Sequence, residues 1–347
     1  MAVSIFDLVK APDLTAYWET YSQDRAPYPL EEVFPSEQKL GLDLSWIKGA
    51  EGRPAVLKPS AFDVGAVPRK RIGFDRLTAQ MPYFKESIYI DEELRQQLNM
   101  VLQTGNQAYI DSVMNRVFRD DVNLIEGAAA RREQMRVMAL TTGAIAMEAN
   151  GQIYSYDYGM PAGHKVEATT SWSNPEADII GDIQTGMDKI EDDTGIKVTR
   201  AMCDRATWNN IRKNTAIRQA IYVMSDGNIQ PSDARIRDYI ADQLDGLEIL
   251  VNTKRYVDDT GVTTPYMPAD TFVLFPAGQL GTTWFGTTPE QSDLMASSVA
   301  NVSITDVGVA VTTTQKTDPV NVETKVSMIC LPSFEAADSV YIIDTKK

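Results

Sequence analysis

The stretch YIDSVMNRVFRDDVNLIEGAAARREQMRVMALTTG, residues 109–143, decides the architecture of this 347-residue chain. Its apolar residues recur at intervals of three and four, which is the spacing of one face of an α-helix. No proline occurs between Pro82 and Pro161, although the chain holds 17, and Gly143 is a natural helix end. The sequence therefore predicts a long amphipathic helix lying across a surface, preceded by a shorter helix that Asp91 would cap.

Alternating apolar and polar residues on both sides of this helix predict β-structure. Residues 143–157 alternate around Asn150-Gly151, the favoured two-residue turn of a hairpin. The C-terminal part alternates again at residues 309–311, 320–331 and 340–343. We expect these terminal strands to pair with the hairpin near residue 150.

Before the helix, two further segments differ from it in composition and in the spacing of their apolar residues. Residues 1–35 combine short apolar groups with four prolines, a pattern that favours an arm laid over something else. Alternation at residues 40–44 and 87–90 flanks a middle rich in glycine, proline and basic residues. This predicts a long two-stranded excursion with a wide loop.

After the hairpin, the sequence pattern changes to a mixture of helical and strand-like segments. Asn174 and Pro175 are good residues for the start of a helix, whose apolar stripe would be Ile179, Ile183, Met187 and Ile190. Strand-like text follows at residues 196–203 and 247–251, and helical text at 206–222 and 232–244. The sequence predicts an inserted α/β unit of roughly 130 residues.

The composition excludes several classes of protein. Lys and Arg total 33 against 48 Asp and Glu, so the net charge is −15 and the chain repels a phosphate backbone. A dedicated nucleic-acid reader is not expected. No window approaches the roughly 18 apolar residues of a membrane span, and the start lacks the pattern of a signal peptide. The only cysteines, Cys203 and Cys330, lie in apolar text and are predicted to be free, buried thiols.

The sequence also offers no catalytic or metal-binding motif. The only histidine, His164, lies in a turn-like segment and is expected in solvent rather than as a base or ligand. Phosphate-binding glycine loops do not occur. Asp-Thr-Gly occurs at residues 193–195 and 259–261, but the first triplet ends a helical run with Gly195 as its cap. The second lies in a hairpin turn, so neither triplet predicts an aspartic protease. We therefore expect no enzyme and no cofactor.

The order of these segments, together with five short motifs, resembles one family. The motifs are Phe118-Arg119-Asp120-Asp121, Trp172-Ser173-Asn174-Pro175 with Asp178-Ile179, Tyr256-Val257-Asp258-Asp259-Thr260-Gly261-Val262, Pro268-Ala269-Asp270-Thr271-Phe272-Val273-Leu274, and the ending from Pro319 to Val340. The chain resembles the major capsid proteins of tailed bacteriophages, whose fold was first described in phage Hong Kong 97. Within them it is similar to the lambda-type major head protein, the capsid protein E family. Each motif consists of caps and turns, so their order and spacing carry the resemblance.

This resemblance implies an α+β fold in four parts. They are an N-terminal arm (1–35), an extended loop (36–88), a peripheral domain with a long spine helix (89–171 and 307–347) and an axial α/β domain (172–306). It implies an icosahedral shell built of hexamers and pentamers, which encloses double-stranded DNA without reading its sequence. A separate scaffolding protein, a portal and a decoration protein are the implied partners. The implied location is the virion, with assembly in the host cytoplasm.

The charge of the extended loop suggests how subunits could meet. Residues 48–76 hold seven positive and three negative side chains (7 − 3 = +4), whereas residues 172–306 hold 11 positive and 20 negative (11 − 20 = −9). We predict that Arg69, Lys70 and Arg71 dock on a neighbouring subunit, although a loop kept soluble by its charge has the same composition. A nanocompartment shell with the same fold and an α/β enzyme built on residues 172–306 are the alternative functions.

Overall fold

The computed structural model describes most of the chain as two compact units. The described residues are 9–23, 25–48, 75–90, 92, 96, 100, 107–149, 152–222, 229–258, 260–296, 300–318 and 320–346. The first unit comprises residues 1–44, 79–135 and 282–333, and the second comprises 45–78, 136–281 and 334–347. No helix among the described residues is long and apolar enough to cross a membrane.

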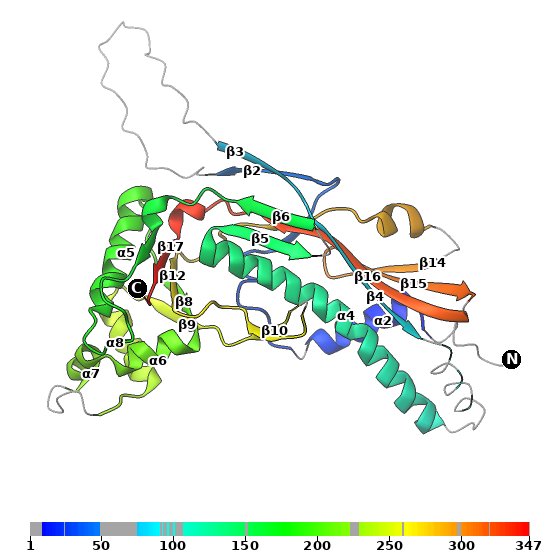
Figure 1. Cartoon of the computed structure of the whole chain (residues 1–347), viewed down its shortest axis with the longest axis horizontal. Coiled ribbons are helices and arrows are strands. Elements are labelled where there is room, and N and C mark those ends of the chain that lie inside the picture. Colours follow the sequence, from blue (N-terminus) through cyan, green and yellow to red (C-terminus); the bar gives the residue numbers. More distant parts are fainter. Residues whose placement is uncertain are drawn as a thin grey trace, which may run out of the picture. The chain divides into compact units, whose positions relative to one another are not determined.

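The predicted long helix is confirmed as α4 (Gln107–Thr142), drawn in green-cyan in Figure 1. It ends where expected, because Gly143 adopts the left-handed φ of +68° and its N–H donates to the Ala139 carbonyl at 2.9 Å. A Cβ at Gly143 would also lie only 2.8 Å from Met160 Cβ. The shorter helix predicted to start at Asp91 lies mostly outside the described residues.

A six-stranded sheet forms the core of the first unit. Its order is β1 (Ser36–Gln38), β13 (Thr283–Phe285), β16 (Val320–Pro332), β15 (Val309–Thr317) and β14 (Ala300–Thr305), and β4 (Tyr83–Ile90) also pairs with β16. The register of β16 runs from Val322 opposite Ile90 to Ile329 opposite Tyr83. The 13-residue strand β16 therefore joins strands from both ends of the chain.

Two predictions about strand partners were wrong. The terminal strands do not pair with the hairpin β5 (Ala144–Ala149) and β6 (Gln152–Asp157), which forms a two-stranded sheet alone. The alternating text at 87–90 is not the second limb of the excursion, because it belongs to β4. The limbs of the excursion are β2 (Asp43–Lys48) and β3 (Asp75–Gln80). Alternation identifies the two faces of a strand, but a strand's partner depends on contacts distant in sequence.

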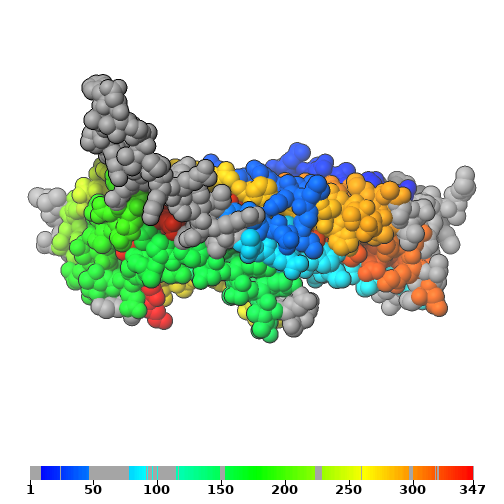
Figure 2. Space-filling model, turned by 90° about the horizontal axis from the view of Figure 1, so that it is seen from above, coloured from blue at the N-terminus to red at the C-terminus, as the bar shows by residue number. Residues whose placement is uncertain are grey.

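The described part of the N-terminal arm contains one helix, α2 (Ala11–Gln23), that lies on the sheet of its own unit. Leu14 and Trp18 are buried, and Trp18 Nε1 donates to Asp306 Oδ1 at 3.3 Å. The Thr15 hydroxyl lies 3.0 Å from the Ser303 hydroxyl of β14. In Figure 2 the blue N-terminal residues accordingly border the orange residues near 300. The expectation of a segment laid over other structure thus holds for these residues.

The second unit contains a five-stranded sheet surrounded by helices. Its order is β7 (Lys165–Glu167), β17 (Tyr341–Asp344), β12 (Thr271–Phe275), β8 (Arg200–Cys203) and β9 (Glu248–Val251). The helices are α5 (Ile179–Thr194), α6 (Arg205–Lys213), α7 (Thr215–Ile221) and α8 (Asp233–Gln243), gathered around the sheet in Figure 1. Trp172, Trp208 and Phe272 are fully buried in its core. The C-terminal strand β17 is therefore an inner strand of this sheet.

The helix boundaries of the second unit differ in detail from the sequence pattern. Helix α5 begins after Asp178, whose carboxylate accepts from the Gly181 N–H at 3.0 Å, and not at Asn174. Asn174 instead closes a turn by accepting from the Glu176 N–H. The predicted stripe of four apolar residues is buried, and Gly195 caps the helix at a φ of +74°. Both residue types cap helices, so composition alone does not select between them.

The shorter predicted elements are mostly present. The strand expected from residue 196 begins at Arg200, and the helical text at 206–222 is divided by Asn214, whose side chain caps α7. The hairpin around residue 260 is confirmed as β10 (Arg255–Val257) and β11 (Thr263–Pro265). Both cysteines are free and buried, as predicted, and burial raises the pKa of the Cys203 thiol to about 12.

Candidate functional site

The basic residues predicted to mediate docking, Arg69, Lys70 and Arg71, lie outside the described residues. The structure does describe how the limb β2 is attached within the second unit. Trp46 is buried and packs on Tyr158, with ring centroids 5.6 Å apart, and Tyr158 packs edge-on against Phe334. Burial also raises the pKa of Tyr158. The extended loop therefore starts from an anchored aromatic base.

A buried carboxylate fixes the segment after β13 to the sheet of the first unit. Glu290, in the π-helical turn η2 (Glu290–Leu294), is 3% exposed. It accepts from Tyr83 Oη at 2.8 Å, Lys325 Nζ at 2.7 Å and Ser327 Oγ at 3.0 Å. Burial would raise the pKa of Glu290, but the Lys325 ammonium and the other donors outweigh it, so its pKa is lowered. Burial and the facing carboxylate raise the pKa of Tyr83 to about 12.

A second ion pair connects the spine helix with the turn between β14 and β15. Arg132 of α4 is nearly buried, and its guanidinium lies 2.5 Å from Asp306 Oδ2 and over the ring of Phe285. Asp306 has a positive φ of 49°, a conformation that aspartate tolerates better than most residues. The same carboxylate accepts from Trp18 of α2. One turn residue thus contacts a side chain of α2 and a side chain of α4.

Asp121 on α4 is a buried carboxyl group without such a counter-charge. It is 2% exposed, and its Oδ2 has no hydrogen-bond partner among the described residues. Burial raises the pKa of Asp121 to about 7, Asp120 adds to the effect, and the Thr324 hydroxyl partly offsets it. The sequence contained the signal, because Asp121 lies four residues from both Val117 and Ile125 on the apolar stripe.

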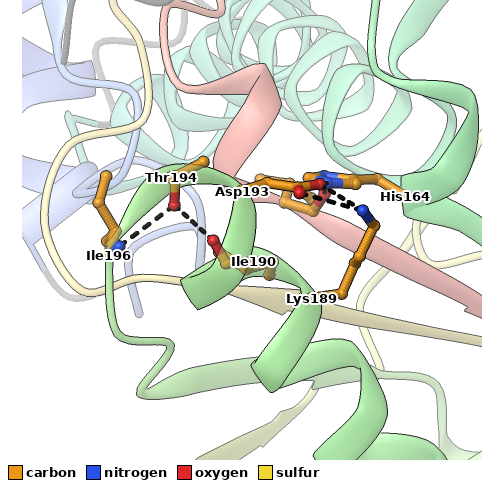
Figure 3. Close-up of polar contacts among 7 residues, drawn as sticks. His164, Lys189, Ile190, Asp193, Thr194 and Ile196 are labelled. Atoms are coloured by element: carbon orange, nitrogen blue, oxygen red, sulfur yellow. Dashed lines mark hydrogen bonds and ion pairs between the residues drawn. The ribbon is translucent and has the colours of Figure 1, made fainter. Parts of the chain in front are cut away.

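The prediction that His164 lies in solvent was wrong. Its side chain is 1% exposed, and both ring nitrogens have partners, Val340 O at 3.1 Å and Asp193 Oδ2 at 2.8 Å. Figure 3 shows His164 and Lys189 converging on Asp193 near the end of α5. Glycine and proline identified the local turn, the 3₁₀ turn η1 (Ala162–His164), but not the elements that pack over it.

Several large apolar side chains are exposed on each of the two units. On the second unit Ile153 is 78% exposed near the end of the β5–β6 hairpin, and Val257 and Val262 are exposed on the β10–β11 hairpin. Next to the latter strands, Asp258 Oδ1 accepts from the N–H groups of Thr260 and Val262, each at 2.9 Å. On the first unit Leu40 is 86% exposed. Single exposed apolar residues are common on protein surfaces, so these side chains alone do not define an interface.

The polar clusters of the described residues serve packing and anchoring within each unit. No group of three or more His, Cys, Asp or Glu among them could hold a metal ion. The polar clusters that do exist, around Glu290, Asp306 and Asp193, join elements of the same unit.

Three solved structures are similar to this chain over most of its length. A phage-related protein from Bordetella bronchiseptica RB50 is similar over 97% of both chains, with a TM-score of 0.56 and 14% identity. The putative capsid protein of a prophage of Escherichia coli CFT073 is similar over 97% of this chain and 99% of its own, with a TM-score of 0.57 and 16% identity. The capsid protein of cyanophage A-1(L) covers 92% of both chains, with a TM-score of 0.51 and 10% identity.

These likenesses show the fold, which is the Hong Kong 97 type predicted from the sequence. No curated protein matches the chain. The family model for phage major capsid protein E, however, matches residues 10–345, nearly the whole sequence. The resemblance recognised in the sequence is therefore confirmed, and the chain belongs to the phage major capsid protein E family.

Proposed function

We propose that this protein is the major subunit of an icosahedral shell that encloses the genome of a tailed bacteriophage. The observation that carries the proposal is the family match over residues 10–345. The fold supports it, because an arm, a two-stranded excursion and exposed hairpins are marginal alone and become stable when packed on neighbours. The acidic charge of −15 suits a container from which packaged DNA must also leave.

The four parts implied by the sequence would then have separate roles. The extended loop (36–88) would reach another subunit, whereas the described helix of the arm (1–35) packs on its own unit. The peripheral domain (89–171 and 307–347) would carry the spine helix, and the axial domain (172–306) would face the centre of each hexamer or pentamer. Chemistry is not part of the proposal, since the described clusters serve as anchors. We expect no cofactor and no membrane contact.

The partners follow from the same proposal. Copies of the chain would form hexamers and pentamers, a separate scaffolding protein would guide their curvature, and a portal would occupy one vertex. A decoration protein could cover the outer surface. Assembly would take place in the host cytoplasm, and the mature protein would reside in the virion. Double-stranded DNA would be enclosed without sequence-specific binding.

Docking of the extended loop would be electrostatic. The loop carries a charge of +4 from residue 48 to 76, and the region from 172 to 306 carries −9. Within that region α5 presents the exposed acids Asp188, Glu191 and Asp192. Opposite charges of this kind steer association and set register more than they add affinity. Arg69, Lys70 and Arg71 are the residues that we assign to this contact.

Charge reversal tests the loop. Changing Arg69, Lys70 and Arg71 to Glu should slow or abolish shell formation, most clearly at low ionic strength, where charges are least screened. The matched control changes three exposed lysines, Lys10, Lys165 and Lys213, to Glu and alters the net charge by the same amount. Light scattering measures assembly, and circular dichroism checks the fold. Equal assembly of both triple variants at low salt would contradict the docking role.

Negative-stain electron microscopy of the protein produced with its scaffolding protein tests the function itself. Closed particles of phage-head size are expected. Small shells loaded with a cellular enzyme would favour the nanocompartment, and a folded monomer with catalytic turnover would favour the enzyme. The loop variants do not enter this experiment, so the function and the docking contact fail independently.

A further inference from the structure

The single histidine of the chain lies between two hydrogen-bond acceptors. His164 Nδ1 is 3.1 Å from the Val340 carbonyl, directly before β17, and Nε2 is 2.8 Å from the carboxylate of Asp193 in the last turn of α5. The histidine side chain and Val340 are both fully buried. Figure 3 shows the Asp193 side of this arrangement. The ring thus connects the helix α5 with the C-terminal strand.

Only one protonation state satisfies both contacts. A backbone carbonyl and a carboxylate can only accept, so each ring nitrogen must carry a hydrogen. The imidazolium has a hydrogen on both nitrogens, whereas either neutral tautomer has one and turns a lone pair toward the other acceptor. Asp193 stays ionised, because hydrogen bonds from Lys189 and His164 lower its pKa. The carboxylate therefore does not supply the missing proton.

Two other side chains, Lys189 and Tyr341, lie near the His164 ring, and neither changes the number of hydrogens that the ring needs for its two contacts. Lys189 of the same helix binds Asp193 at 2.8 Å and donates only. Tyr341 of β17 faces the imidazole with ring centroids 6.0 Å apart. Burial and the charge of Asp182 raise the pKa of Tyr341, which keeps this phenol neutral. Neither Lys189 nor Tyr341 makes a hydrogen bond to a ring nitrogen of His164, whose partners are Val340 and Asp193.

We propose that His164 is a proton-dependent latch that holds the C-terminal strand β17 against α5 when the ring is charged and releases one of its two bonds when the ring is neutral. The strand is an inner member of its sheet, so the latch governs how firmly the last residues of the chain are held in the second unit. Histidine is the side chain whose charge most readily responds to pH near neutrality, so pH is the variable that tests the latch. The proposal does not depend on shell formation.

Hydrogen exchange followed by mass spectrometry tests the latch in the full chain. Protection of a peptide covering residues 336–346, corrected for the intrinsic effect of pH on exchange, should fall about tenfold in the wild type from pH 5.5 to 8. His164→Gln should show low protection that does not change with pH. A peptide covering β10 and β11 serves as an internal reference.

Asp193→Asn gives the sharper comparison. An amide can donate to Nε2 while the neutral ring donates through Nδ1 to Val340, so this variant should keep its protection at pH 8. Lys189→Gln, which removes only the exposed ion pair, should keep the pH dependence of the wild type. The proposal is overturned if the wild type and Asp193→Asn lose protection equally. It is also overturned if the ¹⁵N spectrum, unambiguous for a single histidine, shows a neutral ring at pH 5.5.

Discussion

Replacing Asp121 by Asn should make the first unit more stable at neutral pH. The change removes a buried charge and keeps the size of the side chain, and the Asn amide can still hydrogen-bond the Thr324 hydroxyl, whose contact partly stabilises the Asp121 carboxylate in the wild type. The pKa of Asp121 is raised from 3.8 to about 7 by burial, so the folded state binds a proton that the unfolded state has lost. Wild-type stability from this group is therefore greatest at acid pH and falls as pH rises toward 7.

The size of the effect follows from that shift. A shift of about three pKa units corresponds to about 4 kcal/mol at pH 8, where the carboxylate is fully charged. Between pH 5.5 and 7 the cost of the buried Asp121 charge to the free energy of unfolding grows by about 1.4 kcal/mol per pH unit. The total increase over this interval is about 2 kcal/mol. The advantage of the Asn variant over the wild type should therefore be about 2 kcal/mol larger at pH 8 than at pH 5.5.

Urea unfolding of the unassembled protein at several pH values measures this difference, and comparing the two proteins cancels every other titrating group. Asp120→Asn is the matched control, because Asp120 is the exposed neighbour and should change stability by less than about 0.5 kcal/mol. Parallel pH profiles for the wild type and the Asp121 variant would refute the assignment of a buried, uncompensated carboxyl group.

Three further predictions use the same stability measurement or a labelling assay. Glu290→Gln should lower the free energy of unfolding by about 2–3 kcal/mol, because Lys325 loses its buried partner. Glu323→Gln, at a more exposed ion pair, should lower it by less than about 1 kcal/mol. Equal losses for the two variants would contradict the anchoring role of Glu290. Gly143→Ala should lower the free energy of unfolding by about 1–2 kcal/mol, because Gly143 has a left-handed φ. Gly127→Ala, where a Cβ meets no other atom, should be neutral or stabilising. The reverse order of the two effects would be incompatible with a left-handed helix end at Gly143. Both buried thiols should resist rapid labelling under native conditions, and fast modification of either would show that burial is incomplete.

Local sequence signals identified the elements well where one residue type has one physical role. The spine helix and its glycine end followed from spacing and from the absence of proline, and the stripe of α5 followed in the same way. The start of α5 did not, because Asn174 and Asp178 are equally good caps and packing selects between them. Asp121 could have been found, since its spacing places a carboxyl group on an apolar stripe.

The interactions missed by the sequence analysis depend on residues far apart in the chain. His164 meets Val340 across 176 positions, and Arg132 meets Asp306 across 174. The strand β4 pairs with β16 more than 230 residues away, which no alternation pattern specifies. Capping and periodicity describe neighbours in sequence, whereas these contacts arise only when the chain has folded. The family was recognisable all the same, because the order of many weak motifs is itself specific.

Electron cryo-microscopy of particles formed by this chain with its scaffolding protein tests the central claim most directly. The account predicts a closed icosahedral shell whose vertices are pentamers and whose faces are hexamers, with the fold described above in every subunit. A homogeneous monomer or small oligomer, at high protein concentration and with scaffolding protein supplied, would contradict it.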